Sequence, residues 1–451
     1  MKIQKQVPLT EGPILKSLTG LAVPIMISSF LGTLYNITDM AWIGLLGSKA
    51  VAAVGVGGMY VWLSQGLASL ARMGGQVHVA QCLGRGDKEQ AHRYAKTAVQ
   101  LSILLGLAFA VVSLLFTDPL VAFFKLEGAK AILDAKIYMR ITCGLILFSF
   151  LNLTLTGLYT AQGDSKTPFV ANFIGLLINL LLDPLLILGV GPFPRIEVAG
   201  AAVATVSAQF VVMFVMMVGV FRSKKEENVL KGIRLFEPFS KEELGNICKI
   251  GGPTAIQGMV YCMISMVLTR MVAAFGAEAI ATQRVGGQIE SVSWNTADGF
   301  AAALNAFVGQ NYGAKKMDRV QKGYRISFWT VAIWGALIML AFIIFPGPIA
   351  GVFFHEEKAM EIAISYLIII GFSEAFMCVE LMTIGALSGL GKTKLCSVIS
   401  ITATSMRIPL AMVLSRTSLG LDGIWWALTL TSVAKGIIFY LTFRYQMREK
   451  C

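Results

Sequence analysis

Two carboxylic acids interrupt long apolar runs in the first half of the chain, Asp39 and Asp183. A charged side chain inside an apolar layer such as a lipid bilayer costs at least ~2.5–3.5 kcal/mol unless it is compensated. Acids at such places are therefore candidates for binding or transport chemistry. The second half carries its own acids within apolar runs, which are Glu290, Asp298, Glu374 and Glu380.

The acids of the first half come with polar neighbours at helical spacing. Three predicted helices each carry a stripe of polar and small residues on one face. The stripes are Ser28, Gly32, Asn36 and Asp39; Asn172, Gly175, Asn179 and Asp183; and Thr205 with Gln209. Where such stripes meet, the oxygen-rich set suits a hard monovalent cation. Alternatively, burial and mutual repulsion favour the uptake of a proton by one carboxylate.

Asp39 and Asp183 have two interpretations. Either they cap or snorkel at helix ends near a membrane surface, or they form one site together. The two halves of the chain repeat each other, and the equivalent places in the second half hold the apolar residues Leu268 and Ala411. This favours the interpretation that Asp39 and Asp183 form one site. The duplicated chain thus keeps acids at these places only once.

The chain has ample helical material to position these residues. Of its 451 residues 56% are hydrophobic and 14% charged, and the mean hydropathy is +0.70. A soluble protein carries about 25% charged residues, and a membrane-spanning helix needs roughly 20 mostly apolar ones. Twelve such runs lie at residues 17–44, 51–80, 95–116, 136–160, 168–190, 198–221, 246–274, 280–308, 324–345, 362–388, 395–414 and 422–443. We therefore expect an all-α integral membrane protein with twelve transmembrane helices.

The two halves of the chain repeat each other. The matched pairs are Pro24 and Pro253, Gly47 and Gly276, and Gln81 and Gln310 at an offset of 229 residues, then Gly157 and Gly385 at 228. Internal repeats in a membrane chain are typical of secondary transporters. We predict two pseudo-symmetric six-helix bundles, an N-lobe at 1–221 and a C-lobe at 246–451, joined by a cytoplasmic linker at 222–245.

The net charge of +12 does not indicate a nucleic-acid partner. Lys and Arg gather in alternate connections between the apolar runs, with the largest sets at 222–249 and 315–325. The positive-inside rule then puts both chain ends in the cytoplasm, in a multi-pass protein of the cell membrane. No cleavable signal peptide is evident, since the first run is long and lacks a small-residue cleavage pattern.

Cysteine and histidine give no sign of a metal or cofactor. The seven cysteines are scattered without CxxC spacing, and the three histidines do not cluster. The chain also shows no Ser/His/Asp set, no HExxH motif and no P-loop. We therefore expect neither an enzyme nor an ATP-driven pump, and no cofactor.

An ordered set of motifs resembles the multidrug and toxic compound extrusion (MATE) family over nearly the whole chain. The motifs are Asp39-Met40-Ala41-Trp42-Ile43-Gly44, Gln81-Cys82-Leu83-Gly84, Gly163-Asp164-Ser165-Lys166-Thr167-Pro168 and Gly309-Gln310-Asn311-Tyr312-Gly313-Ala314. The resemblance implies a twelve-helix antiporter that exports organic, often cationic or amphipathic compounds in exchange for protons or sodium ions. We expect it to act as a monomer in the lipid bilayer.

The resemblance also implies roles for particular residues. Those at the positions of the N-lobe cation site are Asp39, Asn179, Asp183 and Thr205. Some members of the family have a C-lobe cation site with an acid on the tenth helix, which Glu374 resembles. Their acid on the seventh helix has no match here, where Gln257 and Tyr261 stand instead. That departure points to a DinF-like, N-lobe-coupled protein rather than a NorM-like one.

Further polar and aromatic residues are candidates for lining a substrate cavity, in which acids would attract cations. They are Asn36, Gln209, Gln257, Tyr261, Glu290, Trp294, Asp298 and Glu374. The alternative for the acids of the second half is burial in ion pairs with Arg270, Arg284 or Arg407. The sequence leaves both interpretations open.

Pro24 interrupts the first apolar run upstream of Asp39 and frees the carbonyl group of Gly20 from its helical hydrogen bond. A weakened helix beside a carboxylate suits a bending gate, and a passive kink is the alternative. A different transport function also stays open. A lipid-linked oligosaccharide flippase of the same superfamily would share the two-lobed architecture, although such relatives often have fourteen spans.

Overall fold

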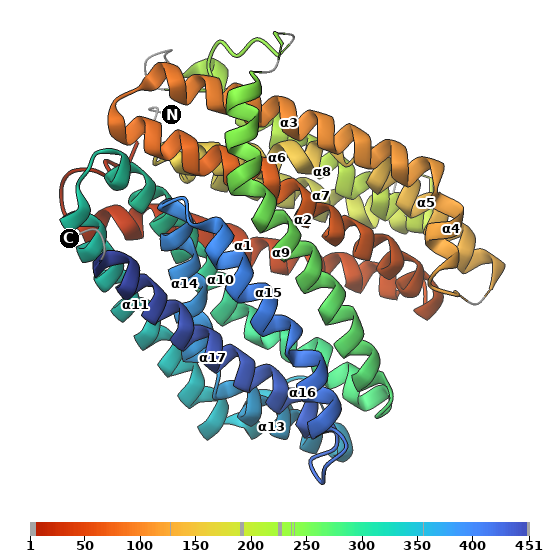
Figure 1. Ribbon diagram of the computed structural model, residues 1–451. Coiled ribbons are helices and arrows are strands. Elements are labelled where there is room, and N and C mark those ends of the chain that lie inside the picture. The colour runs from red at the N-terminus through yellow and green to blue at the C-terminus, as the bar shows by residue number, and fades with distance from the viewer. Residues whose placement is uncertain are drawn as a thin grey trace. The chain divides into compact units, whose positions relative to one another are not determined.

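A computed structural model of the protein describes residues 6–126, 128–189, 194–223, 228–235, 237–238, 240–354 and 356–448. Within these ranges the regular elements are all α-helices (Figure 1). In the first half they are α1 (Ile14–Gly44), α2 (Ser48–Arg85), α3 (Lys88–Leu115), α4 (Thr117–Ala122), α5 (Ala129–Gly144), α6 (Leu147–Ala161), α7 (Lys166–Ile187) and α8 (Glu197–Arg222). In the second half they are α9 (Lys241–Ala273), α10 (Ala277–Gly313), α11 (Met317–Ile344), α12 (Pro346–Gly351), α13 (Glu357–Gly371), α14 (Glu374–Gly389), α15 (Thr393–Ser405), α16 (Arg407–Leu414) and α17 (Leu421–Arg448).

In the described residues, each of the twelve predicted apolar runs is mainly helical, which confirms the all-α membrane fold. Nine helical segments are long and apolar enough to span a membrane, and two bent pairs raise that number to eleven in the described part of the chain. The eighth predicted run, α10, is a single helix of 37 residues but is not among these eleven. Its interior carries charged and polar residues, which lower its hydropathy.

The fourth helical run of each half is bent at an equivalent place. α5 and α6 meet at 43°, and α13 and α14 meet at 49°. From the sequence, each of the runs 136–160 and 362–388 was expected to be one uninterrupted span. The bends therefore show that the repeat, read from motifs in the sequence, extends to the course of the backbone.

Close packing repeats between the halves as well. A Cβ atom placed on Gly57 of α2 would collide with the ring of Tyr138 on α5. The same clash would occur in the second half between Gly286 of α10 and Tyr366 of α13. Gly57 and Gly286 are related by the 229-residue offset, and the two tyrosines by 228. Each half thus uses a glycine to admit a tyrosine side chain at the same point.

The chain divides into two compact units that share α1 and α9. The first unit is mainly Ile27–Gly258, and the second is Pro8–Met26 together with the chain from Met259 onward. The second unit therefore takes the start of α1, and the first unit takes the start of α9. The expected division into lobes at 1–221 and 246–451 with a linker at 222–245 stays a prediction.

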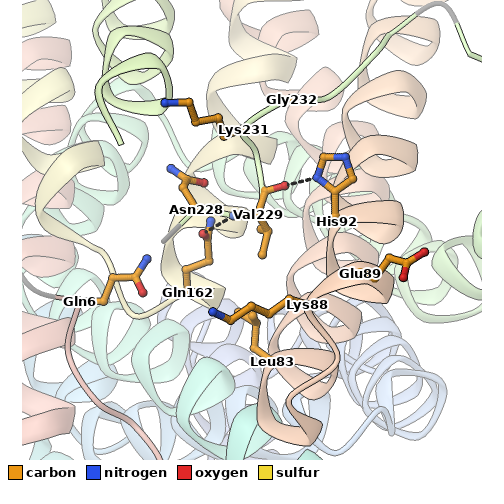
Figure 2. A pocket seen from close by; sticks show the side chains of 10 residues that line it. All are labelled: Gln6, Leu83, Lys88, Glu89, His92, Gln162, Asn228, Val229, Lys231 and Gly232. Carbon is orange, nitrogen blue, oxygen red and sulfur yellow. Dashed lines mark hydrogen bonds between the residues drawn. The ribbon is translucent and has the colours of Figure 1, made fainter. Parts of the chain in front are cut away.

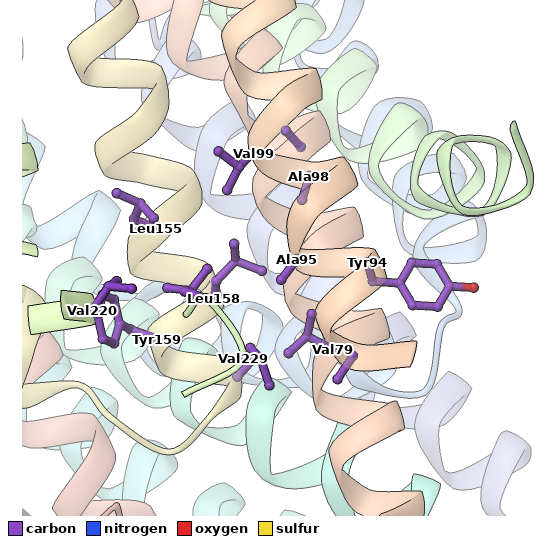
Figure 3. Close-up of a cluster of buried hydrophobic side chains, with 14 of the residues drawn as sticks. Val79, Tyr94, Ala95, Ala98, Val99, Leu155, Leu158, Tyr159, Val220 and Val229 are labelled. Atoms are coloured by element: carbon purple, nitrogen blue, oxygen red, sulfur yellow. The ribbon is translucent and has the colours of Figure 1, made fainter. Parts of the chain in front are cut away.

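One hydrophobic cluster of the first unit gathers side chains mainly from α2, α3, α6 and α8, together with Ala171 of α7 and Ile247 of α9 (Figure 3). Leu158 and Ala95 are fully buried at its centre. Val229 from the connection between the halves also packs into this cluster and is 9% exposed. Val229 and Leu230 of the connection are thus part of this cluster.

Side chains of α3 hold the same connection by hydrogen bonds. His92 Nδ1 lies 2.7 Å from the carbonyl oxygen of Val229, and Gln100 Nε2 donates to the carbonyl oxygen of Leu235 at 2.8 Å. Between them Lys96 forms an ion pair of 2.7 Å with Glu237 and lowers the pKa of that carboxyl. Because the three side chains are spaced four residues apart, they share one face of α3.

Candidate functional site

The two acids of the first half are brought together inside the first unit. Asp39 on α1 is 7% exposed and Asp183 on α7 is fully buried, and the two carboxylates interact through their charges. Asn179, one turn before Asp183, donates its amide to Asp183 Oδ1 at 3.2 Å. Asp39 Oδ1 and Asp183 Oδ2 are buried without a hydrogen-bond partner among the described residues. The pair therefore presents two oxygens that lack a proton donor or a cation.

Hydroxyl groups complete the surroundings of this carboxyl pair. Tyr35 on α1 donates to Thr205 Oγ1 on α8 at 2.8 Å. Tyr35 and Tyr138 both lie within electrostatic range of Asp39 and Asp183. The arrangement thus gathers two carboxylates, one amide and three hydroxyls from four helices.

Two of these hydroxyls were not among the predicted site residues. Tyr35 lies one helical turn before Asp39, so the spacing that selected Asn36 also contained the signal for Tyr35. Tyr138 comes from α5, a helix on which no polar stripe was recognised. Its place beside the acids depends on the packing space left by Gly57.

Small residues let the helices approach closely enough to form the site. A Cβ atom on Gly175 of α7 would collide with Val212 of α8, and one on Gly200 would lie 2.6 Å from the carbonyl oxygen of Leu186. Gly175 belongs to the same stripe as Asn179 and Asp183. The stripe on α7 therefore carries both the polar side chains of the site and the glycine that lets α7 pack closely against α8.

The substrate-cavity candidates of the first unit have different environments. Gln209 on α8 is half-buried and accepts a hydrogen bond from Asn152 of α6 at 2.7 Å on Oε1. Asn36 on α1 is exposed, and Gln257 on α9 is half-buried. The amide oxygen of Gln209 is thus held by a side chain of the neighbouring helix α6.

The acids of the second unit lie in a mixed cluster of charges. Tyr366 donates a short hydrogen bond to Glu290 of α10, and the charge of Arg407 acts on the same carboxylate. Glu380 of α14 forms an ion pair of 2.8 Å with Lys435 of α17, and both side chains are only 6% exposed. The sequence allowed the acids of the second half to form buried ion pairs, and Glu380 does so. Its partner Lys435 was not among the basic residues expected.

The other residues singled out in the second half are more scattered. Glu374 is 1% exposed, and neither of its carboxyl oxygens has a hydrogen-bond partner among the described residues. Tyr261 and Trp294 are exposed, at 45% and 47%, and Asp298 is half-buried. The predicted partners Arg270 and Arg284 are exposed. Of the three arginines considered, Arg407 is the buried one.

A separate pocket of about 380 Å³ lies where the connection between the halves meets α3 (Figure 2). Its wall includes Lys88 and His92 of α3 and Lys231 of the connection. Val229 is held there from both sides, by His92 at 2.7 Å and by Gln162, which accepts from the Val229 amide at 3.0 Å. None of the carboxyl-pair residues lines this pocket. In the described part of the chain, no three His, Cys, Asp or Glu side chains group as metal ligands would.

The sequence model of the MatE family matches residues 24–185 and 253–413, two stretches that begin 229 residues apart. They contain both acids of the carboxyl pair in the first half and the charge cluster up to Arg407 in the second. The chain belongs to the MatE family. It is accordingly a multi-pass membrane transporter and not an enzyme.

Proteins of known name resemble the chain over nearly its whole length. It is 29% identical to the probable multidrug resistance protein NorM of Thermotoga maritima, covering 98% of this chain and 95% of that protein. It is 25% identical to a protein of Shewanella oneidensis named FAD transporter, over 96% and 95% of the two chains. Among solved structures, a MATE protein in its straight conformation has a TM-score of 0.90 at 24% identity, over 99% of both chains. These relatives do not resolve whether the chain is DinF-like or NorM-like.

Proposed function

We propose that this MatE-family member is an antiporter that exports organic cations or amphipathic compounds from the cytoplasm in exchange for a proton or a sodium ion. The coupling cation binds at Asp39 and Asp183. Asn179 orients the Asp183 carboxylate, and Thr205 contributes a hydroxyl together with Tyr35 and Tyr138. The protein works as a monomer in the cell membrane and uses no cofactor.

The single observation that carries this proposal is a pair of buried carboxylate oxygens, Asp39 Oδ1 and Asp183 Oδ2, for which the described part of the chain offers no hydrogen-bond partner. Two unit charges about 4 Å apart interact by ~4 kcal/mol at an effective dielectric constant near 20. A proton or a sodium ion removes that repulsion, and its release restores it. A term of this size is enough to shift an equilibrium between two conformations.

The orientation of the protein in the membrane is inferred from the distribution of basic residues. Lys and Arg are concentrated in alternate connections, so the positive-inside rule puts both termini in the cytoplasm. The relatives named as multidrug resistance proteins support organic compounds as the cargo. The acids within the helices favour cationic cargo over the anionic cargo of a lipid-linked oligosaccharide flippase.

Vesicles with imposed gradients test the proposed function. Purified protein in sealed liposomes should expel a fluorescent organic cation faster when an inward proton or sodium gradient is applied, and only one of the two ions should have this effect. A fluorescent organic anion of similar size serves as the comparison. Equal rates with and without every ion gradient, or selective export of the anion, would show that the proposal is wrong.

A further inference from the structure

Arg407 stands in the second half at the place that Asn179 occupies in the first. The two residues are 228 residues apart, the offset that also relates Gly157 to Gly385 and Tyr138 to Tyr366. Both lie on the helix that packs beside the last helix of its half, α7 against α8 and α16 against α17. A cation therefore stands in the second unit where the first unit has the neutral amide that holds Asp183.

The contacts of Arg407 keep its guanidinium group in a fixed place. The side chain is 7% exposed. Nε donates to Thr431 Oγ1 at 3.0 Å, and Nη2 donates to Ser432 Oγ at 2.9 Å, both on α17. These partners are neutral, so the positive charge of Arg407 is not cancelled by the groups that hold it. Arginine keeps this charge at any physiological pH.

The charge of Arg407 acts on one acid of the second unit. Glu290 of α10 interacts with this charge and also accepts the hydrogen bond of Tyr366 from α13. On α17 the other buried base, Lys435, is paired with Glu380 of α14. Two acids are thus balanced by two bases that belong to the protein. The remaining charged neighbour is Glu374 of α14, which interacts with Glu290 through its charge.

Among the described residues of the first unit, no base acts in this way on Asp39 or Asp183. Asp183 accepts a hydrogen bond from the amide of Asn179, and Asp39 Oδ1 and Asp183 Oδ2 have no partner in the same part of the chain. When Gly200 at the start of α8 is aligned with Gly423 at the start of α17, the residue of the first half that aligns with Lys435 is Val212. The two halves therefore share a backbone arrangement and differ in whether the balancing cation is built in.

We propose that Arg407 is the resident cation of the second unit, occupying the place of an exchangeable ion and confining the coupling cation to the carboxyl pair of the first unit. Arg407 is thus a residue that determines how many cations the transporter binds. This inference rests on the proposed function of Asp39 and Asp183. It adds that the positive charge beside Glu290 keeps the coupling ion out of the second unit, even though both carboxyl oxygens of Glu374 lack a hydrogen-bond partner among the described residues.

Removing the guanidinium group should open a cation site in the second unit. The test uses full-length purified protein in which Asp39→Asn and Asp183→Asn silence the first site. Bound sodium is counted by equilibrium dialysis at mildly alkaline pH, and proton uptake by difference titration. This background should bind no coupling cation. Adding Arg407→Gln should restore one cation per protein, because Glu290 loses its compensating charge, and Glu290→Gln should abolish that gain.

Two further variants separate the possible failures. Arg407→Lys keeps a positive charge and should leave the silenced background without a cation. In otherwise unmodified protein, Glu290→Gln should not change the number of bound cations, which tests the idea without altering Arg407. A folded, monodisperse Arg407→Gln protein that gains no cation, or a loss of the bound cation in Glu290→Gln, would overturn the inference. A silenced background that still binds a cation independently of Glu290 would instead contradict the proposed function of the first site.

Discussion

Asn179 donates its side-chain amide to the Asp183 carboxylate at 3.2 Å, one helical turn apart on α7. Because Asp183 is fully buried, this hydrogen bond helps to fix the orientation of its carboxylate. The contact orients Oδ1 and leaves Oδ2 without a partner in the described residues. A side chain that orients one oxygen and frees the other is suited to positioning an exchangeable cation.

Substituting Asn179 by Ala should weaken cation binding without unfolding the protein. A hydrogen bond to a charged group contributes roughly 1.5–3 kcal/mol, which corresponds to roughly 10- to 100-fold in the cation concentration for half-maximal transport. Asn172→Ala, two turns earlier on the same helix, is the matched control and should change this concentration by less than threefold. Equal effects of the two substitutions would count against an orienting role.

Gly57→Ala should disturb the carboxyl pair through Tyr138. The added Cβ atom would collide with the tyrosine ring, and overpacking of this kind costs about 1–3 kcal/mol. We expect a lower melting temperature together with a change in the ion dependence of transport. Gly58→Ala is the control, because a Cβ atom there meets no other heavy atom within 4 Å. The idea fails if Gly57→Ala melts lower yet transports with an unaltered ion dependence.

Removing one partner of the ion pair between Lys435 and Glu380 should destabilise the protein more than removing both. Lys435→Ala leaves a buried carboxylate without its partner, which costs about 3–5 kcal/mol in other proteins. Lys435→Met combined with Glu380→Leu removes both charges and should recover most of the loss. Thermal unfolding in detergent measures this, with Lys358→Ala as the comparison, since that lysine is 72% exposed in its pair with Glu278. Additive losses in the double variant would contradict this account.

Pro24 and Pro253 are equivalent prolines, but only the helix of Pro24 has an acid of the carboxyl pair. Each lies inside its helix and close to the place where α1 or α9 passes from one unit to the other. Because α1 carries Asp39 and α9 has Leu268 at the equivalent place, Pro24→Ala should lower the turnover rate more than it raises KM. Pro253→Ala should have the smaller effect on turnover. Unchanged turnover in well-expressed Pro24→Ala protein would exclude bending of α1 as the gate.

The sequence predicted the fold well because membrane spans and repeats leave local signals. Apolar runs of fixed length mark helices, and glycines at one offset mark the duplication. The stripe of Asn172, Gly175, Asn179 and Asp183 predicted one wall of the site, since 3.6-residue periodicity puts these side chains on one face. The bends between α5 and α6 and between α13 and α14 were missed, although a glycine ends the helix before each of them, Gly144 and Gly371, because glycine is also frequent inside membrane helices.

Contacts between distant helices were beyond the reach of the sequence. Lys435 lies in an apolar run whose register against α14 no local pattern fixes, so its pairing with Glu380 went unpredicted. Tyr138 was missed for a similar reason, because its position depends on the space beside Gly57. The assignment of cation-binding roles to Asp39, Asn179, Asp183 and Thr205 stays a prediction, since geometry alone shows proximity and not ion binding.

The most direct test of the central proposal is gradient-driven export by Asp39→Asn and Asp183→Asn proteins in sealed liposomes. Asparagine keeps the shape of aspartate but cannot release a proton and lacks a charge for sodium. Each single variant should lose at least tenfold in gradient-driven export while keeping its melting temperature and its binding of the organic cation. Asp118→Asn, an acid exposed outside the spans, serves as the control and should transport normally. If Asp39→Asn and Asp183→Asn both export the organic cation at the unmodified rate, the carboxyl pair is not the coupling site.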